Sequence, residues 1–512
     1  MTAPGTWFLL LFPVLVLLVR YSVATLLSGK RTREQQDQQP PSPPALPILG
    51  HIHLVGSLPH VSFGTLAKKH GLDLMMLRLG AMPVIVVTSP RVAEAVLRTH
   101  DLVFASRPSA LATEIIMYGS SNIGFTPYGE YWRQAKKLVT THLLNVNKVR
   151  SFRQAREEEV SMVMAQISEA AVAGATVDMS GLLGSFTNNV ACRAVMGRFF
   201  RNESGRYTQL RELIGHTSPL IGGFNVEEFF PFLARFGVLS KVVRAKSERV
   251  KRRWDELLDR AIQDHEEEEH SSVKRASDPE DFIQVLLSFR QEYDLTREHI
   301  KALLLDVFFG AIETSASTLD FIMAELMRRP DVMRKLQAEV RSRVPQGQEL
   351  VTGADLADMH YLRAVIKESL RLHPVAPLLA PHFSTKSCSI DGFAVPAKVR
   401  VVINAWAIGR DERFWEDAKE FVPERFLDSG SAAEIDFKGN DFRFLPFGSG
   451  RRMCPGMNFA MANMEVMLAN LIHHFDWELA LGQERHDIDM MEVFGLVVHR
   501  KQKLLLVPKL RV

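Results

Sequence analysis

The sequence has few cysteines: the 512 residues include only three, Cys192, Cys388 and Cys454. An odd number of widely separated cysteines argues against a disulfide framework and offers no spacing typical of a zinc site. Such a composition is typical of a protein whose folded body stays in a reducing compartment such as the cytosol.

Strong net charge is missing as well. The formal charge is +3 and the pI is about 8.6, which is too mild to indicate a nucleic-acid partner. A G-x-G-x-x-G run after a predicted strand is also absent, so the chain shows no recognisable site for NADPH or flavin. With 46% hydrophobic and 24% charged residues, the sequence predicts a globular protein with a large core.

One long hydrophobic run is present, from Trp7 to Leu27. Its 21 residues are enough to span a bilayer, and Arg20 lies close enough to one end to reach the interface. No charged side chain precedes the run, and three basic residues follow it: Lys30, Arg31 and Arg33. The positive-inside bias then predicts that the rest of the chain lies in the cytosol. The alternative is a cleaved signal peptide, although the basic segment that usually opens one is missing.

A proline-rich segment follows, with five prolines between positions 40 and 47. Such a segment is stiff and extended and can serve as a spacer, although it can also bind partner domains. We therefore expect three parts: a membrane anchor at residues 1–29, a basic and proline-rich linker at 30–55, and one globular domain at 56–512.

Most of the globular part has helical periodicity. Two short runs rich in β-branched residues, Pro83–Thr88 and Arg400–Ala405, predict strands, and the acidic run Glu266–Glu269 is expected in a charged surface loop. A helix-rich chain with minor sheet predicts a mainly α (α+β) fold in one domain. The longest predicted helices cover residues 149–167, 244–265, 297–328 and 331–344.

Cys454 lies in a run that matches F-x-x-G-x-R-x-C-x-G at every fixed position, namely Phe447, Gly450, Arg452, Cys454 and Gly456. Glycines let the backbone turn tightly and approach a flat macrocycle. Backbone N–H groups can stabilise a thiolate, and the planar guanidinium of Arg452 can pair with a propionate. The pattern therefore indicates Cys454 as the axial ligand of a haem iron. The alternative is an inert buried cysteine in a glycine-rich loop.

This run resembles the haem-binding loop of the cytochrome P-450 family, and the resemblance extends over nearly the whole chain. It implies a single-domain cytochrome P-450 fold, haem b as the cofactor, and residues 56–512 as the haem-thiolate catalytic domain. It also implies a monooxygenase that uses O2, a small hydrophobic substrate and electrons from NADPH–cytochrome P-450 reductase. Basic residues that would attract the acidic surface of the reductase are Arg133, Lys137, Arg451 and Arg452.

The same resemblance implies a location in the endoplasmic reticulum membrane. The protein would be held there by one N-terminal transmembrane helix, in contact with membrane lipid, with the catalytic domain facing the cytosol.

Glu313 and Thr314 lie in an apolar helical stretch. Burying a carboxylate or a hydroxyl there costs free energy, which suggests that these side chains have a function. Thr314 can hydrogen-bond a carbonyl of its own helix and open a local bulge, and Glu313 can relay protons as an acid. The alternative is an amphipathic helix whose Glu faces water. In the family this stretch usually has Ala-Gly before the acid and alcohol. Here the pair is reversed as Gly310-Ala311, so we expect altered geometry on the oxygen side.

An E-x-x-R pattern places Glu368 and Arg371 on one helix face. The resemblance adds Arg425, which in the family completes a Glu–Arg–Arg cluster behind the haem. We expect this cluster to fix the proximal side of the domain.

Two further segments resemble family contacts to the haem propionates. Trp132 and Lys136 lie four residues apart, as in a W-x-x-x-R helix, but lysine replaces the usual arginine. His382 takes a position where arginine is common, and a propionate would favour its protonated form. The alternative for His382 is a hydrogen-bonded structural histidine.

Family positions also imply an apolar pocket, and therefore a hydrophobic substrate of modest size. The amino-acid sequence of residues 128–144 resembles that of plant A-type enzymes of grasses that oxidise indole derivatives in benzoxazinoid synthesis. A terpenoid or phenolic hydroxylase stays open, as do a haem-thiolate rearrangement enzyme and a non-catalytic haem-binding scaffold. The residues expected to line the pocket are Ile115, Ile116, Phe308, Val375, Leu378, Leu379, Phe494 and Leu496.

Overall fold

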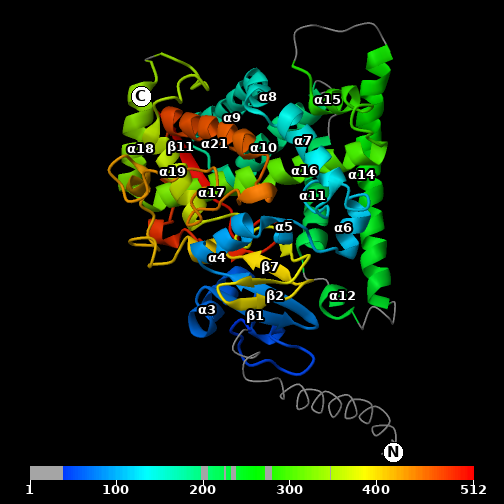
Figure 1. The fold of residues 1–512 in the computed structure, drawn as a ribbon. Coiled ribbons are helices and arrows are strands. Elements are labelled where there is room, and N and C mark those ends of the chain that lie inside the picture. Colours follow the sequence, from blue (N-terminus) through cyan, green and yellow to red (C-terminus); the bar gives the residue numbers. More distant parts are fainter. Residues whose placement is uncertain are drawn as a thin grey trace, which may run out of the picture.

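The computed structural model describes residues 39–197, 206–223, 226–231, 238–270, 279–345 and 347–511. The expected anchor and the first residues of the linker lie outside these ranges. Figure 1 shows a helix-rich body with a small sheet at one end. The predicted fold class, mainly α with minor β, is confirmed.

Helices make up most of the described chain. They are α3 (Pro59–His70), α4 (Pro90–Glu94), α5 (Asp101–Phe104), α6 (Leu111–Ile116), α7 (Glu130–Leu138), α8 (Val146–Ser151), α9 (Arg153–Ala173), α10 (Met179–Met196), α11 (Arg206–Gly222), α12 (Val226–Phe229), α14 (Val238–His270), α15 (Phe282–Ser288), α16 (Arg297–Ala311), α17 (Glu313–Arg328), α18 (Pro330–Arg343), α19 (His360–Leu372), α20 (Ala405–Ile408) and α21 (Met457–His474).

The strands are short. They are β1 (Leu74–Leu79), β2 (Met82–Val87), β3 (Val177–Asp178), β4 (His382–Phe383), β5 (Cys388–Ile390), β6 (Phe393–Val395), β7 (Arg400–Ile403), β8 (Phe475–Leu479), β9 (Glu492–Val493), β10 (His499–Arg500) and β11 (Leu505–Leu510).

The main sheet has the strand order β1-β2-β7-β4. β1 and β2 form an antiparallel hairpin, and β2 pairs in parallel with β7, so that Val84 lies opposite Arg400. The two β-branched runs are therefore strands, as predicted. A second sheet has the order β3-β11-β8, and β5–β6 and β9–β10 form two separate hairpins.

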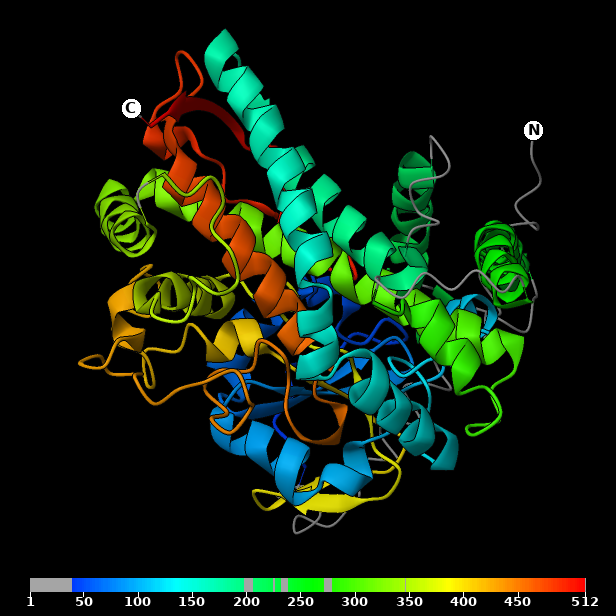
Figure 2. The ribbon, with the colours of Figure 1, turned by 90° about the horizontal axis from the view of Figure 1, so that it is seen from above.

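The core is built around α17, which packs against α10, α19 and α21 and is buried along most of its length. In the view of Figure 2, α9 and α21 lie side by side. Among the described residues, Arg297–Arg328 is the one stretch long and apolar enough to cross a membrane. Most of its apolar window is buried inside the protein, which is how a core helix behaves.

The predicted helical stretch 297–328 is confirmed as α16 and α17, which are separated by Ile312 alone, next to Thr314, where a local bulge was expected. One prediction about a helix boundary is wrong. The acidic run Glu266–Glu269 is not a loop, since α14 continues to His270. One physical reason is that Arg297 and Arg290 form ion pairs with Glu266, at 2.8 and 3.6 Å, and neutralise charge near the helix end.

Candidate active site

Cys454 lies between η6 (Gly450–Arg452) and the first turn of α21. Its N–H donates to the Phe447 carbonyl at 2.9 Å, which closes the loop. Gly450 has a φ of +66°, and a Cβ there would lie 2.2 Å from the Leu97 carbonyl oxygen, so only glycine fits. The fixed residues of the motif thus fold Cys454 onto the N-terminal end of α21.

The backbone at the start of α21 is directed at the sulfur. Burial raises the pKa of the Cys454 thiol, while hydrogen bonds from the Gly456 and Met457 N–H groups and the charge of Lys136 lower it in part. These groups would stabilise a thiolate, which is the form that binds a metal.

Cys454 borders open space although protein surrounds it. Gly310, inside the core helix α16, is exposed too, and a Cβ built on it would have no heavy atom within 4 Å. Residues that line an internal cavity keep accessible surface even when they lie on a core helix or in an enclosed loop. This fits a large planar group placed between the loop and α16.

One buried cation, Arg107, and two half-buried cations, Lys136 and Arg452, gather beside this space. Among the described residues, Arg107, Lys136 and Arg452 form no ion pair with a carboxylate, and they donate instead to backbone carbonyls. Burial lowers the pKa of Arg107 to about 9, of Lys136 to about 8 and of Arg452 to about 10. Asp306 raises the pKa of Lys136 and Arg452 only in part, and positive charge removed from water without an ion pair is costly. Two propionates would compensate it, so this cluster fits haem b.

Each predicted propionate contact has a defined place in this cluster. The guanidinium of Arg452 lies 4.3 Å from the centroid of the Trp132 ring. Lys136 Nζ donates to the carbonyl of Met453, next to Cys454, at 2.7 Å. The sequence patterns thus predicted that Trp132, Lys136 and Arg452 share one site, but no pattern marked Arg107.

His382 is buried beside the same cations. Its Nδ1 lies 2.8 Å from the Phe104 carbonyl oxygen, and burial together with the charge of Arg107 lowers its pKa to about 3. Against protein groups alone the ring is therefore neutral. Its protonation by a propionate stays a prediction.

On the opposite side, the helix break at Ile312 opens beside Thr314. Thr314 Oγ1 donates to the Gly310 carbonyl at 2.5 Å, as predicted for a side chain that competes with the helix ladder. α16 itself begins at a capping box in which Thr296 accepts from the N–H of His299.

Glu313 is half-buried and accepts a hydrogen bond from Ser218 of α11 at 3.1 Å. Burial raises the pKa of Glu313, while the bond from Ser218 and the charge of His499 lower it in part. A carboxyl with a raised pKa is better suited to donate a proton. Sequence reasoning missed Ser218, because nothing in α11 marks one serine among its neighbours.

Asp306 is a second residue whose role was missed. Its carboxylate accepts from Asn122 Nδ2 and from the Ile123 N–H, both at 2.6 Å, and so fastens the loop before α7 to α16. Burial raises the pKa of Asp306 to about 6.

The predicted Glu–Arg–Arg cluster is present. Glu368 accepts two bonds from Arg371, both at 2.7 Å, and two from Arg425 Nε, both at 3.1 Å. All three side chains are almost fully buried. Arg371 also donates to the Ala418 carbonyl at 2.7 Å, so the cluster joins α19, η5 (Pro423–Phe426) and the loop between them.

Two of the residues expected to line the substrate pocket do not do so. Phe308 and Ile116 have no exposed surface, and the Phe308 ring packs 6.0 Å from that of Trp254. A side chain lining a cavity would keep accessible area, so both belong to the core. Leu379, Phe494 and Leu496 are partly buried and stay candidates.

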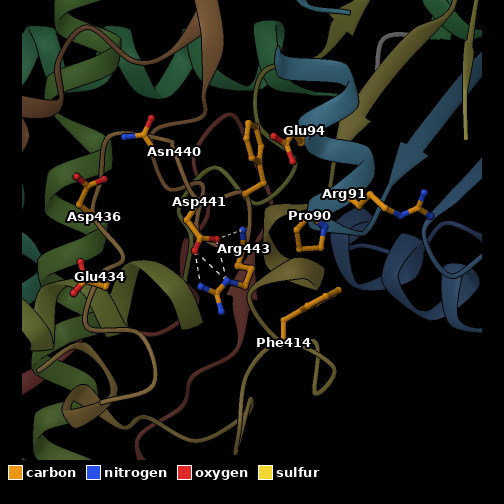
Figure 3. A pocket seen from close by; sticks show the side chains of 10 residues that line it. Pro90, Arg91, Glu94, Phe414, Glu434, Asp436, Asn440, Asp441 and Arg443 are labelled. Atoms are coloured by element: carbon orange, nitrogen blue, oxygen red, sulfur yellow. Dashed lines mark hydrogen bonds and ion pairs between the residues drawn. The ribbon is translucent and has the colours of Figure 1, made fainter. Parts of the chain in front are cut away.

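A separate pocket opens on the surface between the start of α4 and residues 434–443 (Figure 3). It has a volume of about 520 Å³ and charged walls, including the paired Asp441 and Arg443 and the carboxylates of Glu94 and Glu434. None of the predicted site residues lines it. Its open, charged character does not fit a hydrophobic substrate.

The fold and the cysteine loop fit a haem-binding protein, and comparison with known proteins agrees. The cytochrome P-450 family model matches residues 40–507. The chain belongs to the cytochrome P-450 family. As a member it is a monooxygenase that binds haem b and uses O2, a redox partner and a small substrate.

Curated relatives from maize are similar over almost the full length. Indole-2-monooxygenase of Zea mays is 54% identical over 91% of this chain and 86% of that protein. Indolin-2-one monooxygenase of Zea mays is 49% identical over 98% of this chain and 94% of that protein. A zebrafish cytochrome P-450 structure with progesterone has a TM-score of 0.75 and covers 88% of this chain and 99% of that one. At 24% identity it shows the fold alone.

Proposed function

We propose that this chain is a plant microsomal monooxygenase whose substrate is a small indole derivative. The observation that carries the proposal is the 54% identity to maize indole-2-monooxygenase over 91% of the chain. The 49% identity to indolin-2-one monooxygenase supports the same substrate class. One oxygen atom of O2 would enter the substrate and the other would leave as water.

The chain would be held in the endoplasmic reticulum membrane by residues 1–29 as a single span, with 30–55 as linker and 56–512 as catalytic domain in the cytosol. Electrons would come from NADPH–cytochrome P-450 reductase. The apolar run Trp7–Leu27 and the basic residues after it support this topology. Lys137, Arg451 and Arg133 are exposed, and Lys137 forms no ion pair among the described residues, whereas Arg451 pairs with Asp101 and Arg133 with Glu130; an acidic partner surface would suit Lys137 best.

The haem, when bound, would supply the redox chemistry of dioxygen activation. Cys454 would bind its iron, in the loop shaped by Phe447, Gly450 and Gly456. Backbone N–H groups of α21 would hold the sulfur as thiolate. The residues that would hold the propionates are Trp132, Lys136, His382 and Arg452, together with Arg107.

Glu313 and Thr314 would handle protons on the opposite side. The Thr314 hydroxyl is held against the Gly310 carbonyl at the helix break, and the Glu313 carboxyl is held by Ser218. With its pKa raised by burial, Glu313 would take a proton from the solvent side and pass it toward Thr314.

The proposal is tested by expressing the full chain in microsomes with the reductase and offering matched panels of indoles, terpenoids and phenolics. We expect NADPH-dependent oxygenation of an indole derivative, and no product when the reductase is left out. Turnover confined to a terpenoid or phenolic would contradict the substrate class. Oxygenation that needs no reductase would contradict the electron source.

A further inference from the structure

The β9–β10 hairpin carries Phe494 and Leu496, two of the residues expected to line the substrate pocket. The tip of the hairpin lies against the end of α11, where a Cβ built on Gly222 would lie 2.6 Å from the Leu496 nitrogen. Ser218 lies one helical turn before Gly222 on the same face of α11, and it donates to Glu313. The hairpin tip therefore packs on the face of α11 that meets the proton-handling side of the site.

Each strand of the hairpin is fastened to the body by a charged side chain. On β10, Arg500 Nε lies 3.3 Å from Asp320 Oδ2 of α17. On β9, Glu492 Oε2 lies 2.7 Å from Nε2 of His60 in α3. The His60 side chain is fully buried and that of Glu492 is only 11% exposed. The hairpin is thus held between α17 and α3.

The imidazole ring of His60 contacts both Glu492 and Phe494. The Phe494 ring stacks on it, with centroids 5.9 Å apart and 27° between the ring planes. The Trp406 ring of α20 meets it edge-on at 5.4 Å. Side chains two positions apart in an extended chain point to the same side, which is why Glu492 and Phe494 reach one ring. A single imidazole therefore links a buried carboxylate to an aromatic side chain of the expected pocket.

Glu492 provides the polar contact that sets the orientation of the His60 ring. The Nδ1 atom of His60 is buried and has no hydrogen-bond partner among the described residues, so the ring is held through Nε2. Burial acts to raise the pKa of Glu492, but the hydrogen bond and charge of His60 and the charge of Arg410 hold that pKa below its ordinary value. Glu492 is therefore ionised and accepts from the Nε2–H of His60. Without this carboxylate no polar contact would fix the rotation of the buried ring.

We propose that Glu492 is a positioning residue for ligand selectivity, which fixes the place of the Phe494 ring at the substrate pocket through His60. This inference rests on the proposed function, because it takes Phe494 to face the small aromatic substrate. An aromatic side chain held at one angle discriminates between ring-shaped ligands by offset or edge-to-face packing. Glu492 acts from outside the pocket, on the far side of the His60 ring.

The test measures ligand binding by the full-length, haem-loaded protein as a shift of the haem absorption band. The probes are imidazole and 4-phenylimidazole, which adds a ring directed into the pocket. Glu492→Ala removes the acceptor for His60, and Glu492→Gln keeps an acceptor of the same shape. The control is Glu484→Ala, because Glu484 also contacts a histidine, His486, at 3.3 Å, but on the open surface.

We expect Glu492→Ala to weaken the binding of 4-phenylimidazole by about fivefold or more, and that of imidazole by less than about twofold. Glu492→Gln and Glu484→Ala should bind both probes within about twofold of the parent protein. In a Phe494→Ala background, Glu492→Ala should have no further effect on 4-phenylimidazole, because the two residues act as one unit.

Unchanged binding of 4-phenylimidazole by Glu492→Ala, or an equal loss for both probes, overturns the inference. An effect of Glu492→Ala that persists in the Phe494→Ala background overturns the route through Phe494. If Glu492→Ala does not load haem, Glu492→Asp takes its place. It keeps the charge and draws the His60 ring back by one methylene, so an unchanged ratio of the two affinities overturns the inference.

Failure of the proposed function has a different outcome. If the parent protein oxygenates no indole, the proposed substrate class is contradicted. The two probes do not depend on that substrate, so their affinity ratio still decides the role of Glu492.

Discussion

At the scale of single residues, two groups of charged side chains differ in how they are compensated. The first group forms no ion pair among the described residues, and the second forms a complete ion-pair cluster. Arg107, Lys136 and Arg452 are the first kind: none of them forms an ion pair among the described residues, and burial lowers the pKa of each. Glu368 with Arg371 and Arg425 is the second kind. The first group would be stabilised by a cofactor, and the second stabilises the fold.

Replacing Glu368 with alanine should therefore be severe. It would leave two buried guanidinium groups without their carboxylate, at a cost of about 3–5 kcal/mol. We expect little soluble, haem-loaded protein, measured as haem absorbance per mole of chain. Glu412→Ala is the matched control, because Glu412 pairs with Lys419 on the open surface and should be neutral within about 0.5 kcal/mol. Normal haem loading of the Glu368 variant would refute the structural role of the cluster.

Ser218 is expected to position Glu313. Ser218→Ala removes a hydrogen bond that lowers the pKa of Glu313, so that pKa should rise further. The pH profile of turnover should shift to higher pH, and more reducing equivalents should be lost as peroxide. Ser218→Thr keeps the hydroxyl and should restore the profile. If the alanine and threonine variants have the same profile as the parent, Ser218 does not act through Glu313.

At the scale of elements, the tie between α16 and the loop before α7 depends on pH. Burial raises the pKa of Asp306 from 3.8 to about 6, so the folded chain binds this proton more tightly than the unfolded chain does. The stability that this proton gives is complete below about pH 4 and is lost as the pH rises through about 6. A shift of about two units corresponds to about 3 kcal/mol.

Asp306→Asn removes this titration. The difference in unfolding free energy between parent and variant, measured by urea denaturation, should shift by about 2.5 kcal/mol against the parent between pH 4 and pH 7. A difference that stays constant over this range would show that Asp306 is not protonated in the folded state.

The loop of Cys454 offers a second test of an element. Gly450→Ala would force a Cβ into the Leu97 carbonyl and into a left-handed backbone, so we expect the loop to shift and haem loading to fall at least tenfold. Gly174 has a similar φ of +61° with open space around it, and Gly174→Ala should cost only about 1 kcal/mol. Equal haem loading of the two variants would show that the close approach at Gly450 is unimportant.

At the scale of the whole molecule, the sequence predicted what depends on local patterns. The cysteine loop, the E-x-x-R pair and the two strands follow from spacing and residue type. Arg107, Ser218 and Asp306 could not be found in this way, because each meets a partner far away in sequence and no pattern marks it beforehand. Phe308 was assigned to the pocket by its family position, which does not tell which side chain of the helix meets Trp254 of α14. Glu266 was assigned to a loop because its partners, Arg290 after α15 and Arg297 at the start of α16, could not be identified from the sequence.

The central claim is that the Cys454 sulfur binds the haem iron, and absorption spectroscopy tests it most directly. The purified full-length protein should be reduced, exposed to carbon monoxide and compared with Cys454→Ser prepared in the same way. We predict the red-shifted Soret band of a thiolate-ligated haem for the parent protein and the loss of that band for the serine variant. A parent spectrum without this band, or the same band in both proteins, would contradict the account.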